Sequence, residues 1–416
     1  MSTPAFPIDA VRARFPALSI SDPGGQRVYF DAPGGTQICN DAIDGMVAHL
    51  RSGTANAGGS FASSIDTDAM SVAAHEAMAD LLGGQPGEIA FGPNMTSLTF
   101  ALSRALAQGW QAGDEIVLSR LDHDANISPW LLAARDRDVT VRWIEIDTDS
   151  GTLRLDELPG LLGAKTRLVA VGGASNALGT INDIRAIVDI VRAHSTALVF
   201  VDAVQSVPHV PTDVATLGCD FLACSPYKFF GPHQGVLWGR AELLDGLAAY
   251  KVRPASSQPP AVRFETGTPS FEGQAGVLGT IAYLEWLGRQ VAPGINDRRS
   301  ALLAAMTACV AYEYQLGERL LAGLATIPGL RLYGPPTMDN RVPTFAFTIK
   351  GYHPKDVAAH LATRAINAWA GHFYAIEPVG QLGLADSGGL LRVGLCHYND
   401  ASEVDRLIAA LRELAV

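Results

Sequence analysis

The feature that most constrains the fold is an alternation of short apolar runs with helical patterns between about residues 85 and 240. Each run has the length of a buried strand, and strands that alternate with helices predict βαβ units in a mostly parallel sheet. The predicted strands are residues 115–119, 140–144, 168–171, 198–201, 221–224 and 236–238. Apolar residues spaced three and four apart predict a crossover helix over 183–194, with Asp183 as its N-cap. We therefore expect an α/β fold with helices packed on the sheet.

The chain is longer than one hydrophobic core usually fills. Its 416 residues predict a large domain and a smaller one, because single cores stop growing at ~250–300 residues. The pattern changes after residue 285, where a smaller α/β segment begins. The elements expected there are a long helix at 298–325, strands near 344–349 and 390–393, and a final helix near 401–414. We expect a large domain over 22–290 and a small one over 291–416, with segment 1–21 packing on the small domain.

The net charge and the cysteines of the chain limit which binding partners and which cellular compartment we expect for the protein. The formal net charge is -11 and no block of Lys and Arg occurs, so nucleic acid is not expected as a partner. The five cysteines form no CxxC pair, which indicates no zinc site and suits a reducing cytosol. The sequence gives no support for any other metal. No apolar run approaches the ~18 residues that span a bilayer, and no secretory signal pattern is visible. We expect a cytoplasmic protein with no membrane partner.

Two polar residues follow neighbouring predicted strands at the edge where open α/β sheets bind ligands. Asp202 directly follows the run 198–201, and Ser225 and Lys228 follow the run 221–224. A carboxylate and a lysine so placed suit pyridoxal 5'-phosphate (PLP), because the carboxylate pairs with the pyridinium nitrogen and the lysine forms a Schiff base. The sequence therefore predicts a cofactor enzyme.

A phosphate site is predicted at the start of the helix that follows the apolar run ending at Phe91. Met95, Thr96 and Ser97 open that helix and offer amide and hydroxyl donors at the positive end of its dipole. The alternative is an ordinary N-cap. The place of this helix before the Asp202 and Lys228 strands favours the phosphate.

Four further polar residues are candidates for the site. His123 follows a strand end, where it can lie over the cofactor ring and relay protons. Asn176 ends another strand and can contact cofactor or substrate, and Gln205 can donate to the cofactor's phenolic oxygen. Each of these three can instead be an ordinary structural or turn residue. Arg392 lies within an apolar strand, so it needs either an amino acid carboxylate or an acidic side chain as partner.

These segments, taken in order from about Val28 to the carboxyl terminus, resemble the class V aminotransferase family, and within it the cysteine desulfurases and selenocysteine lyases. The matching segments are 28–31, 122–130, 175–180, 201–206, 225–228, 263–269 and 391–392. The resemblance implies a fold type I PLP-dependent transferase, with a large cofactor-binding domain and a smaller C-terminal α/β domain.

The resemblance also implies a role for each residue at the ring. Lys228 would hold the cofactor covalently and move the substrate's α-proton. Asp202 would keep the pyridine nitrogen protonated, while His123 would stack on the ring and Gln205 would contact its oxygen. Arg392 would bind the substrate carboxylate.

At the other end of the cofactor, the resemblance implies that Thr96, Ser225 and the backbone of Met95 hold the phosphate. Gly267 and Thr268 would reach the phosphate of a partner subunit. A homodimer with active sites at the subunit interface is therefore implied.

The chain departs from the desulfurases at their catalytic cysteine. Desulfurases carry it in a segment resembling Gly-His-His-Cys-Ala, and its thiolate takes up the substrate's sulfur as a persulfide. Residues 371–375 read GHFYA here, so Tyr374 stands at that place, and a phenol cannot take up sulfur. Tyr227 also replaces the histidine usual before the lysine. Cys396 or Cys224 could act only by reaching the site, and both lie in the apolar context of buried structural thiols.

The sequence thus predicts a PLP-dependent enzyme that acts on a small amino acid without a cysteine nucleophile. We favour β-elimination of the carbon-sulfur lyase type, in which Tyr374 serves as an acid or as a wall of the site. Transamination, and racemisation of the isopenicillin N epimerase kind, stay open because both also begin with loss of the α-proton. A catalytically silent PLP-binding partner protein is the alternative from another class. The retained Lys228, Asp202 and Arg392 speak against it.

Overall fold

A seven-stranded sheet organises the larger part of the computed structural model, which describes residues 6–414. Residues 1–5 of the predicted N-terminal segment and residues 415–416 of the predicted small domain lie outside the described part. The strands in spatial order are β4 (Ile89–Gly92), β12 (Gly235–Gly239), β11 (Phe221–Cys224), β10 (Leu198–Asp202), β9 (Thr166–Gly172), β5 (Glu115–Ser119) and β6 (Thr140–Ile144). The strands from β11 to β6 pair in parallel, and β12 runs antiparallel to both β11 and the edge strand β4. The predicted mostly parallel α/β sheet is confirmed.

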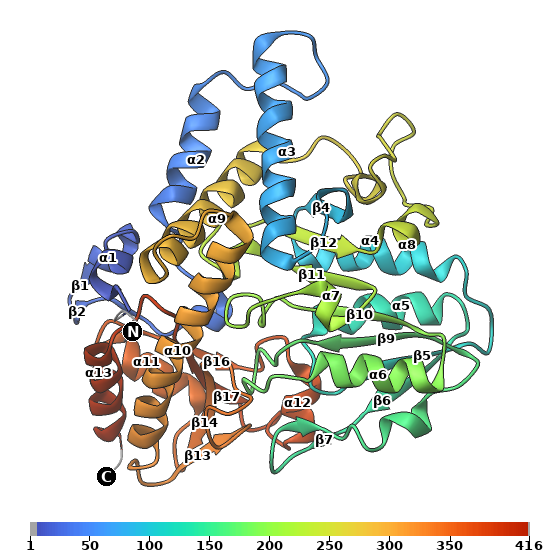
Figure 1. Ribbon diagram of the computed structural model, residues 1–416. Helices are drawn as coiled ribbons and strands as arrows, with labels where there is room; N and C mark the ends of the chain where they lie inside the picture. The colour runs from blue at the N-terminus through green and yellow to red at the C-terminus, as the bar shows by residue number, and fades with distance from the viewer. Residues whose placement is uncertain (1–5, 415–416) are drawn as a thin grey trace.

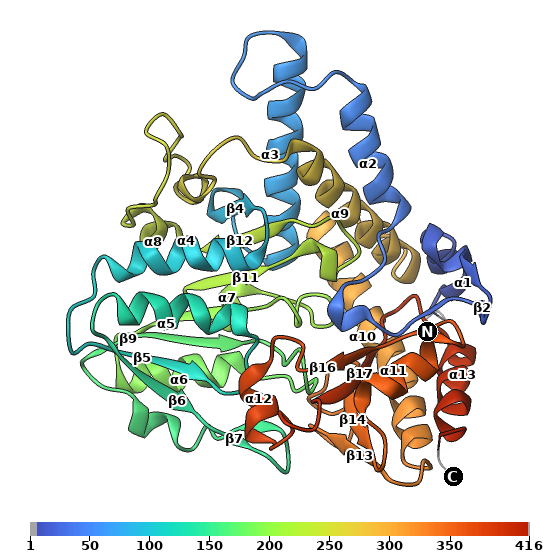
Figure 2. The same ribbon diagram turned by 180° about the vertical axis from the view of Figure 1, so that it is seen from behind.

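Helices cover both faces of this sheet because side chains alternate along each buried strand. On β10, Val199 and Val201 belong to one hydrophobic cluster and Phe200 to the other. Figures 1 and 2 show α6 (Ile184–His194) and α7 (Val214–Leu217) on one face, and α4 (Met95–Ala107) and α5 (Ser128–Arg135) on the other. As predicted, α6 begins after Asp183, whose carboxylate accepts a hydrogen bond from Ala186 N.

A group of longer helices packs beside the sheet and extends past it (Figure 1). Helix α9 contacts α2, α3 and α10. Their bounds are α2 (Asn40–Arg51), α3 (Ala62–Leu82), α9 (Phe271–Val291) and α10 (Arg298–Leu324), and the short α8 (Ala241–Asp245) follows β12. These helices bury the apolar side chains of β4 and β12 at that end of the sheet.

A second, four-stranded antiparallel sheet lies in the C-terminal part. Its strands in order are β13 (Leu330–Tyr333), β14 (Thr344–Ile349), β17 (Leu390–Gly394) and β16 (Trp369–Gly371). Its helices are α11 (Pro354–Ala362), α12 (Ile376–Gln381) and α13 (Ala401–Arg412). Side chains of β14, β17, α10, α11 and α13 form a separate hydrophobic core. The predicted boundaries at residues 22 and 290 stay predictions.

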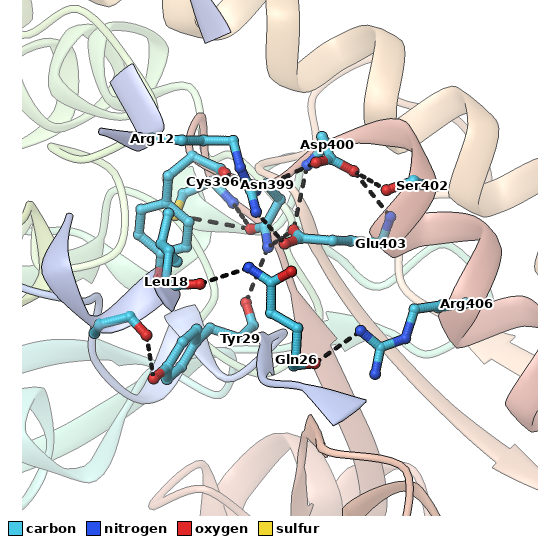
Figure 3. A network of polar contacts seen from close by, with 12 residues as sticks. Arg12, Leu18, Gln26, Tyr29, Cys396, Asn399, Asp400, Ser402, Glu403 and Arg406 are labelled. Atoms are coloured by element: carbon cyan, nitrogen blue, oxygen red, sulfur yellow. Dashed lines mark hydrogen bonds and ion pairs between the residues drawn. The ribbon is translucent and has the colours of Figure 1, made fainter. Parts of the chain in front are cut away.

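The N-terminal segment is bound to the C-terminal part by polar contacts (Figure 3). Arg12, in α1 (Ile8–Arg12), forms an ion pair of 2.9 Å with Glu403 and donates to the carbonyl of Tyr398 at 2.7 Å. Asn399 donates to the carbonyl of Tyr29 at 3.2 Å. The remaining two-stranded ribbons pair β1 (Ser21–Asp22) with β2 (Gly25–Gln26), β3 (Val28–Tyr29) with β15 (Ile366–Asn367), and β7 (Ile146–Asp147) with β8 (Thr152–Leu153). The N-terminal segment also contacts the larger part of the chain, where Arg14 pairs with Asp41 and Phe15 packs on Phe230. Its assignment to the small domain stays a prediction.

Within residues 6–414, no helix has the length and apolar character needed to cross a bilayer. Over the same residues, His, Cys, Asp and Glu side chains form no group of three or more that could hold a metal ion.

Candidate active site

Most of the predicted site residues gather between the carboxyl ends of the parallel strands and the second sheet. An outer cavity of about 1340 Å³ adjoins an inner one of about 70 Å³. The inner cavity is lined by the predicted residues Met95, Thr96, His123, Asn176, Asp202, Gln205, Ser225 and Lys228. Tyr374 and Arg392 line the outer cavity, which His123, Asn176 and Lys228 also reach. Residues from both sheets therefore share one site.

Gly267 and Thr268 are the exceptions. Both lie in exposed backbone between the 3-10 turn Pro260–Phe264 and α9, and neither lines either cavity. Their predicted contact with the cofactor of a partner subunit stays a prediction.

Lys228 is placed at the inner cavity by the turn that follows β11. The turn Pro226–Lys228 buries its side chain, and Nζ donates a hydrogen bond to the carbonyl of Pro33. The pKa of Lys228 is lowered to about 7, chiefly by burial and also by the charge of Arg392, while Asp202 opposes the shift. A neutral amine is thus available near neutral pH, as a nucleophile or a base must be.

Asp202 lies at the end of β10 and is buried at the inner cavity. Its Oδ1 accepts a hydrogen bond from Val204 N at 3.0 Å. Burial raises the pKa of Asp202 to about 6, although the Val204 amide and Lys228 favour the ionised form. A carboxylate in this environment is stabilised by a cation that faces it, and a protonated pyridine nitrogen is such a cation.

His123 lies between the two cavities. Its Nδ1 accepts from Ala125 N at 3.0 Å, and its ring stacks on that of Tyr374 with centroids 5.5 Å apart and an angle of 30° between the planes. Burial lowers the pKa of His123 to about 4, and Lys228 and Arg392 add to the shift. The imidazole is therefore neutral at neutral pH.

Two amide oxygens at the inner cavity are buried without a hydrogen-bond partner, Asn176 Oδ1 and Gln205 Oε1. Gln205 Nε2 donates to Thr344 Oγ1 at 3.1 Å. Because a hydroxyl can donate as well as accept, a half-turn of the amide keeps this bond and directs Nε2 to the cavity. Buried polar groups are nearly always bonded, so the unpaired oxygens indicate a missing ligand. Gln205 fits the predicted contact with a cofactor oxygen.

The start of α4 faces the inner cavity, as the phosphate prediction requires. Asn94 caps the helix by accepting from Ser97 N at 2.8 Å. Met95 N donates to Ser225 Oγ at 3.1 Å, so two of the predicted phosphate ligands bind one another in this structure. Thr96 lines both cavities. Together with Lys228, Asp202 and Gln205, this helix start fits PLP.

Arg392 projects from β17 and is 4% exposed. Its Nη1 donates to the carbonyl of Asn176 at 2.8 Å, and its Nε is buried without a partner. Burial lowers the pKa of Arg392 to about 9, and the charges of Tyr227 and Asp31 oppose the shift. The contacts of the described residues include no ion pair between Arg392 and an acidic side chain. The structure therefore does not support the salt-bridge alternative, and Arg392 lines the outer cavity while its buried Nε has no partner.

No cysteine among the described residues lines either cavity. Cys224 and Cys396 are fully buried, and burial raises the pKa of both thiols. Neither is placed to replace the missing catalytic cysteine. Tyr374 is 66% exposed and lines the outer cavity at that place.

Sequence reasoning missed a second buried carboxyl group beside the cofactor site. Asp122 lines the inner cavity and accepts from Gly172 N and Asn126 Nδ2, both at 2.8 Å. Burial raises the pKa of Asp122 to about 8, and the charge of Asp202 adds to the shift. The only signal in the sequence is its place next to His123, which does not reveal burial.

The stability of the cofactor-free protein is expected to depend less on pH after Asp122→Asn. Folding raises the Asp122 pKa from 3.8 to about 8, so the folded state holds a proton that the unfolded state loses between these values. The stability from this group is present below the lower pKa and is lost as pH rises through the upper one. Between about pH 5 and about pH 9, the wild-type melting temperature should fall by ~5 °C more than that of the variant. Thermal unfolding followed by circular dichroism measures both falls, and equal falls would contradict the prediction.

Comparisons with known proteins identify the family of the chain. The aminotransferase class-V family model matches residues 28–407. An aminotransferase-like protein from Gibberella zeae is 34% identical over 99% of both chains. A cysteine desulfurase from Klebsiella pneumoniae is 31% identical over 98% of both chains.

Solved structures of cysteine desulfurases share the whole fold. The enzyme from Thermococcus onnurineus NA1 has a TM-score of 0.87 at 26% identity and covers 100% of this chain and 99% of its own. The enzyme CsdA from Escherichia coli has a TM-score of 0.83 at 27% identity, over 99% of this chain and 100% of its own. The chain therefore belongs to the class V aminotransferase family of fold type I, PLP-dependent enzymes, and its relatives there include the cysteine desulfurases.

Proposed function

We propose that the protein catalyses β-elimination from a small, sulfur-containing α-amino acid without a cysteine nucleophile. The observation that carries this proposal is the buried, unpaired edge of Arg392 on the same cavity as the neutral amine of Lys228. A guanidinium edge binds a carboxylate in a bidentate manner, so the two groups suit the carboxylate and the α-carbon of one amino acid.

We assign a separate role in the reaction to each of three residues of the site. Bound PLP supplies an electron sink for negative charge at the substrate's α-carbon. Arg392 holds the carboxylate, and Lys228 Nζ takes the α-proton. Tyr374 is exposed in the outer cavity and gives a proton to the thiolate that leaves the β-carbon.

A second candidate is transamination, because the relative from Gibberella zeae is described as aminotransferase-like. In that reaction Lys228 would return the proton to the cofactor and no bond to the β-carbon would break. The two reactions therefore need the same residues and differ in their products.

S-Methyl-L-cysteine tests the proposal, because a thiolate cannot take a methylated sulfur as a persulfide. Elimination converts it with one water to methanethiol, pyruvate and ammonia in equal amounts. We expect these products from the purified holoenzyme. A 2-oxo acid that keeps the methylthio group would favour transamination, and the D-isomer would favour racemisation. Either result without pyruvate would overturn the proposal.

Single substitutions of the buried cysteines are expected to leave turnover nearly unchanged. Cys224→Ala and Cys396→Ala each remove a thiol that lines neither cavity. The rate of pyruvate release should stay within ~2-fold of wild type, while the melting temperature falls by a few degrees through lost packing. A folded variant that loses turnover would show that its thiol takes part in the reaction.

We further propose that the enzyme is a cytoplasmic homodimer. Gly267 and Thr268 lie away from the cavities of their own chain, where a partner's cofactor could use them. Three large apolar side chains of α3 are exposed, by 59% at its N-cap Phe61, 54% at Ile65 and 57% at Val72. Such exposure suits a surface covered by a second copy.

A further inference from the structure

Phe373 holds a position over the guanidinium of Arg392. The Arg392 Cζ atom lies 4.2 Å from the centroid of the Phe373 ring. A cation at this distance from an aromatic face is attracted by the ring's electron density, and more strongly where water is excluded. Arg392 is 4% exposed, so this contact is largely shielded from water.

Asn176 joins these two residues from the opposite sheet. Its backbone carbonyl accepts from Arg392 Nη1 at 2.8 Å, and its side chain Nδ2 donates to the carbonyl of Phe373 at 2.9 Å. Each of the three residues therefore contacts the other two. One edge of the guanidinium is fixed by Asn176, its face is covered by Phe373, and Nε has no partner.

The backbone that carries Phe373 is held in an unfavourable conformation. Phe373 and Tyr374 have φ values of 56° and 58°, in the left-handed region that side chains other than glycine rarely adopt. Residues in this conformation are strained and persist only where the surroundings fix them. Asn176 fixes the Phe373 carbonyl, and Asp124 N donates to the Tyr374 carbonyl at 2.7 Å.

We propose that Phe373 is a positioning residue that orients Arg392 for the carboxylate of the substrate. The inference rests on the proposed function in one respect, namely that the substrate is an α-amino acid. The ring covers one face of the guanidinium and Asn176 accepts from Nη1, which leaves Nε and Nη2 as donors for a carboxylate. The strained loop keeps the ring in this place before the substrate arrives.

Two probes of the same length separate this role from a general effect on the site. S-Methyl-L-cysteine carries the carboxylate, and 2-(methylthio)ethylamine lacks it. Their dissociation constants are measured from the change in absorbance of the bound cofactor, which requires no turnover. The KM and kcat for S-methyl-L-cysteine are measured alongside.

Phe373→Leu keeps an apolar side chain and removes the aromatic face. We expect the dissociation constant and KM for S-methyl-L-cysteine to rise ~3- to 30-fold, as the range of cation-π energies predicts. The constant for the amine should stay within twofold of wild type. Phe373→Tyr restores the ring and should recover most of the loss, and Phe373→Ala should match or exceed the effect of Phe373→Leu.

Each outcome decides the inference. An equal loss for both probes, no loss for either, or failure of Phe373→Tyr to rescue would overturn it. If the wild-type holoenzyme binds both probes without preference for the carboxylate, the inference also falls. Selective loss of binding without pyruvate release from wild type would support the positioning role and overturn the proposed elimination, so the two failures are distinguishable.

Discussion

Lys228→Ala is expected to lower kcat by ~10²–10⁴-fold or more, because it removes the group that transfers the α-proton. It also removes the nitrogen to which the cofactor binds covalently. In wild type, the band near 410 to 430 nm that is typical of PLP bound to a lysine should be present. In the variant that band should be lost or shifted, since any cofactor that remains is held by non-covalent contacts. Pyruvate release and the absorbance spectrum measure the two effects.

Lys350→Ala is the matched control. Lys350 is exposed after β14 and lines neither cavity. The Lys350→Ala variant changes charge and side-chain length in the same way as Lys228→Ala. Its kcat and absorbance spectrum should equal those of wild type. Turnover and an unchanged band in Lys228→Ala would contradict the role given to this lysine.

Arg392→Leu is expected to lower kcat/KM for S-methyl-L-cysteine by ~10²–10³-fold. Truncating one partner of a buried, hydrogen-bonded charge pair costs about 2–5 kcal/mol, and here the pair would form with the substrate carboxylate. The loss should lie mainly in KM, because the interaction is present before the chemical step. Initial rates over a range of substrate concentrations separate the two constants.

Arg331→Leu provides the comparison for this change. Arg331 is exposed on β13 of the same sheet and lines neither cavity. Its kinetic constants should match wild type. If Arg392→Leu keeps kcat/KM within about threefold of wild type, the substrate carboxylate binds elsewhere.

The fold could be predicted from the sequence because its signals are local. Strands β5 and β11 agree with the predicted apolar runs, since buried strands must be apolar on both faces. The edge strand β6 also has its predicted bounds. Helix α6 begins after Asp183 because a carboxylate there bonds a free amide of the first turn. The placing of Asp202 and Lys228 followed from strand order alone, because the carboxyl ends of parallel strands meet at one edge.

The rest of the site depends on contacts between distant parts of the chain. The carbonyl of Pro33, which accepts from Lys228, belongs to a residue 195 positions away. Asn176 lines both cavities, and its Nδ2 also holds the carbonyl of Phe373, a contact that the sequence did not indicate. No periodicity encodes such pairs, because tertiary packing alone brings them together. The roles proposed for Gly267 and Thr268 involve a second chain, whose position a single sequence does not encode.

The most direct test of the central claim is the product that the purified holoenzyme forms from L-cysteine. Elimination frees the sulfur as sulfide and leaves pyruvate and ammonia. A persulfide route leaves alanine and transfers the sulfur to an enzyme thiol, from which an added thiol such as dithiothreitol releases it as sulfide. The absence of a cysteine from the cavities of the described residues predicts pyruvate equal in amount to sulfide, with no alanine. Alanine equal in amount to the sulfur released, without pyruvate, would contradict the account and require a cysteine nucleophile.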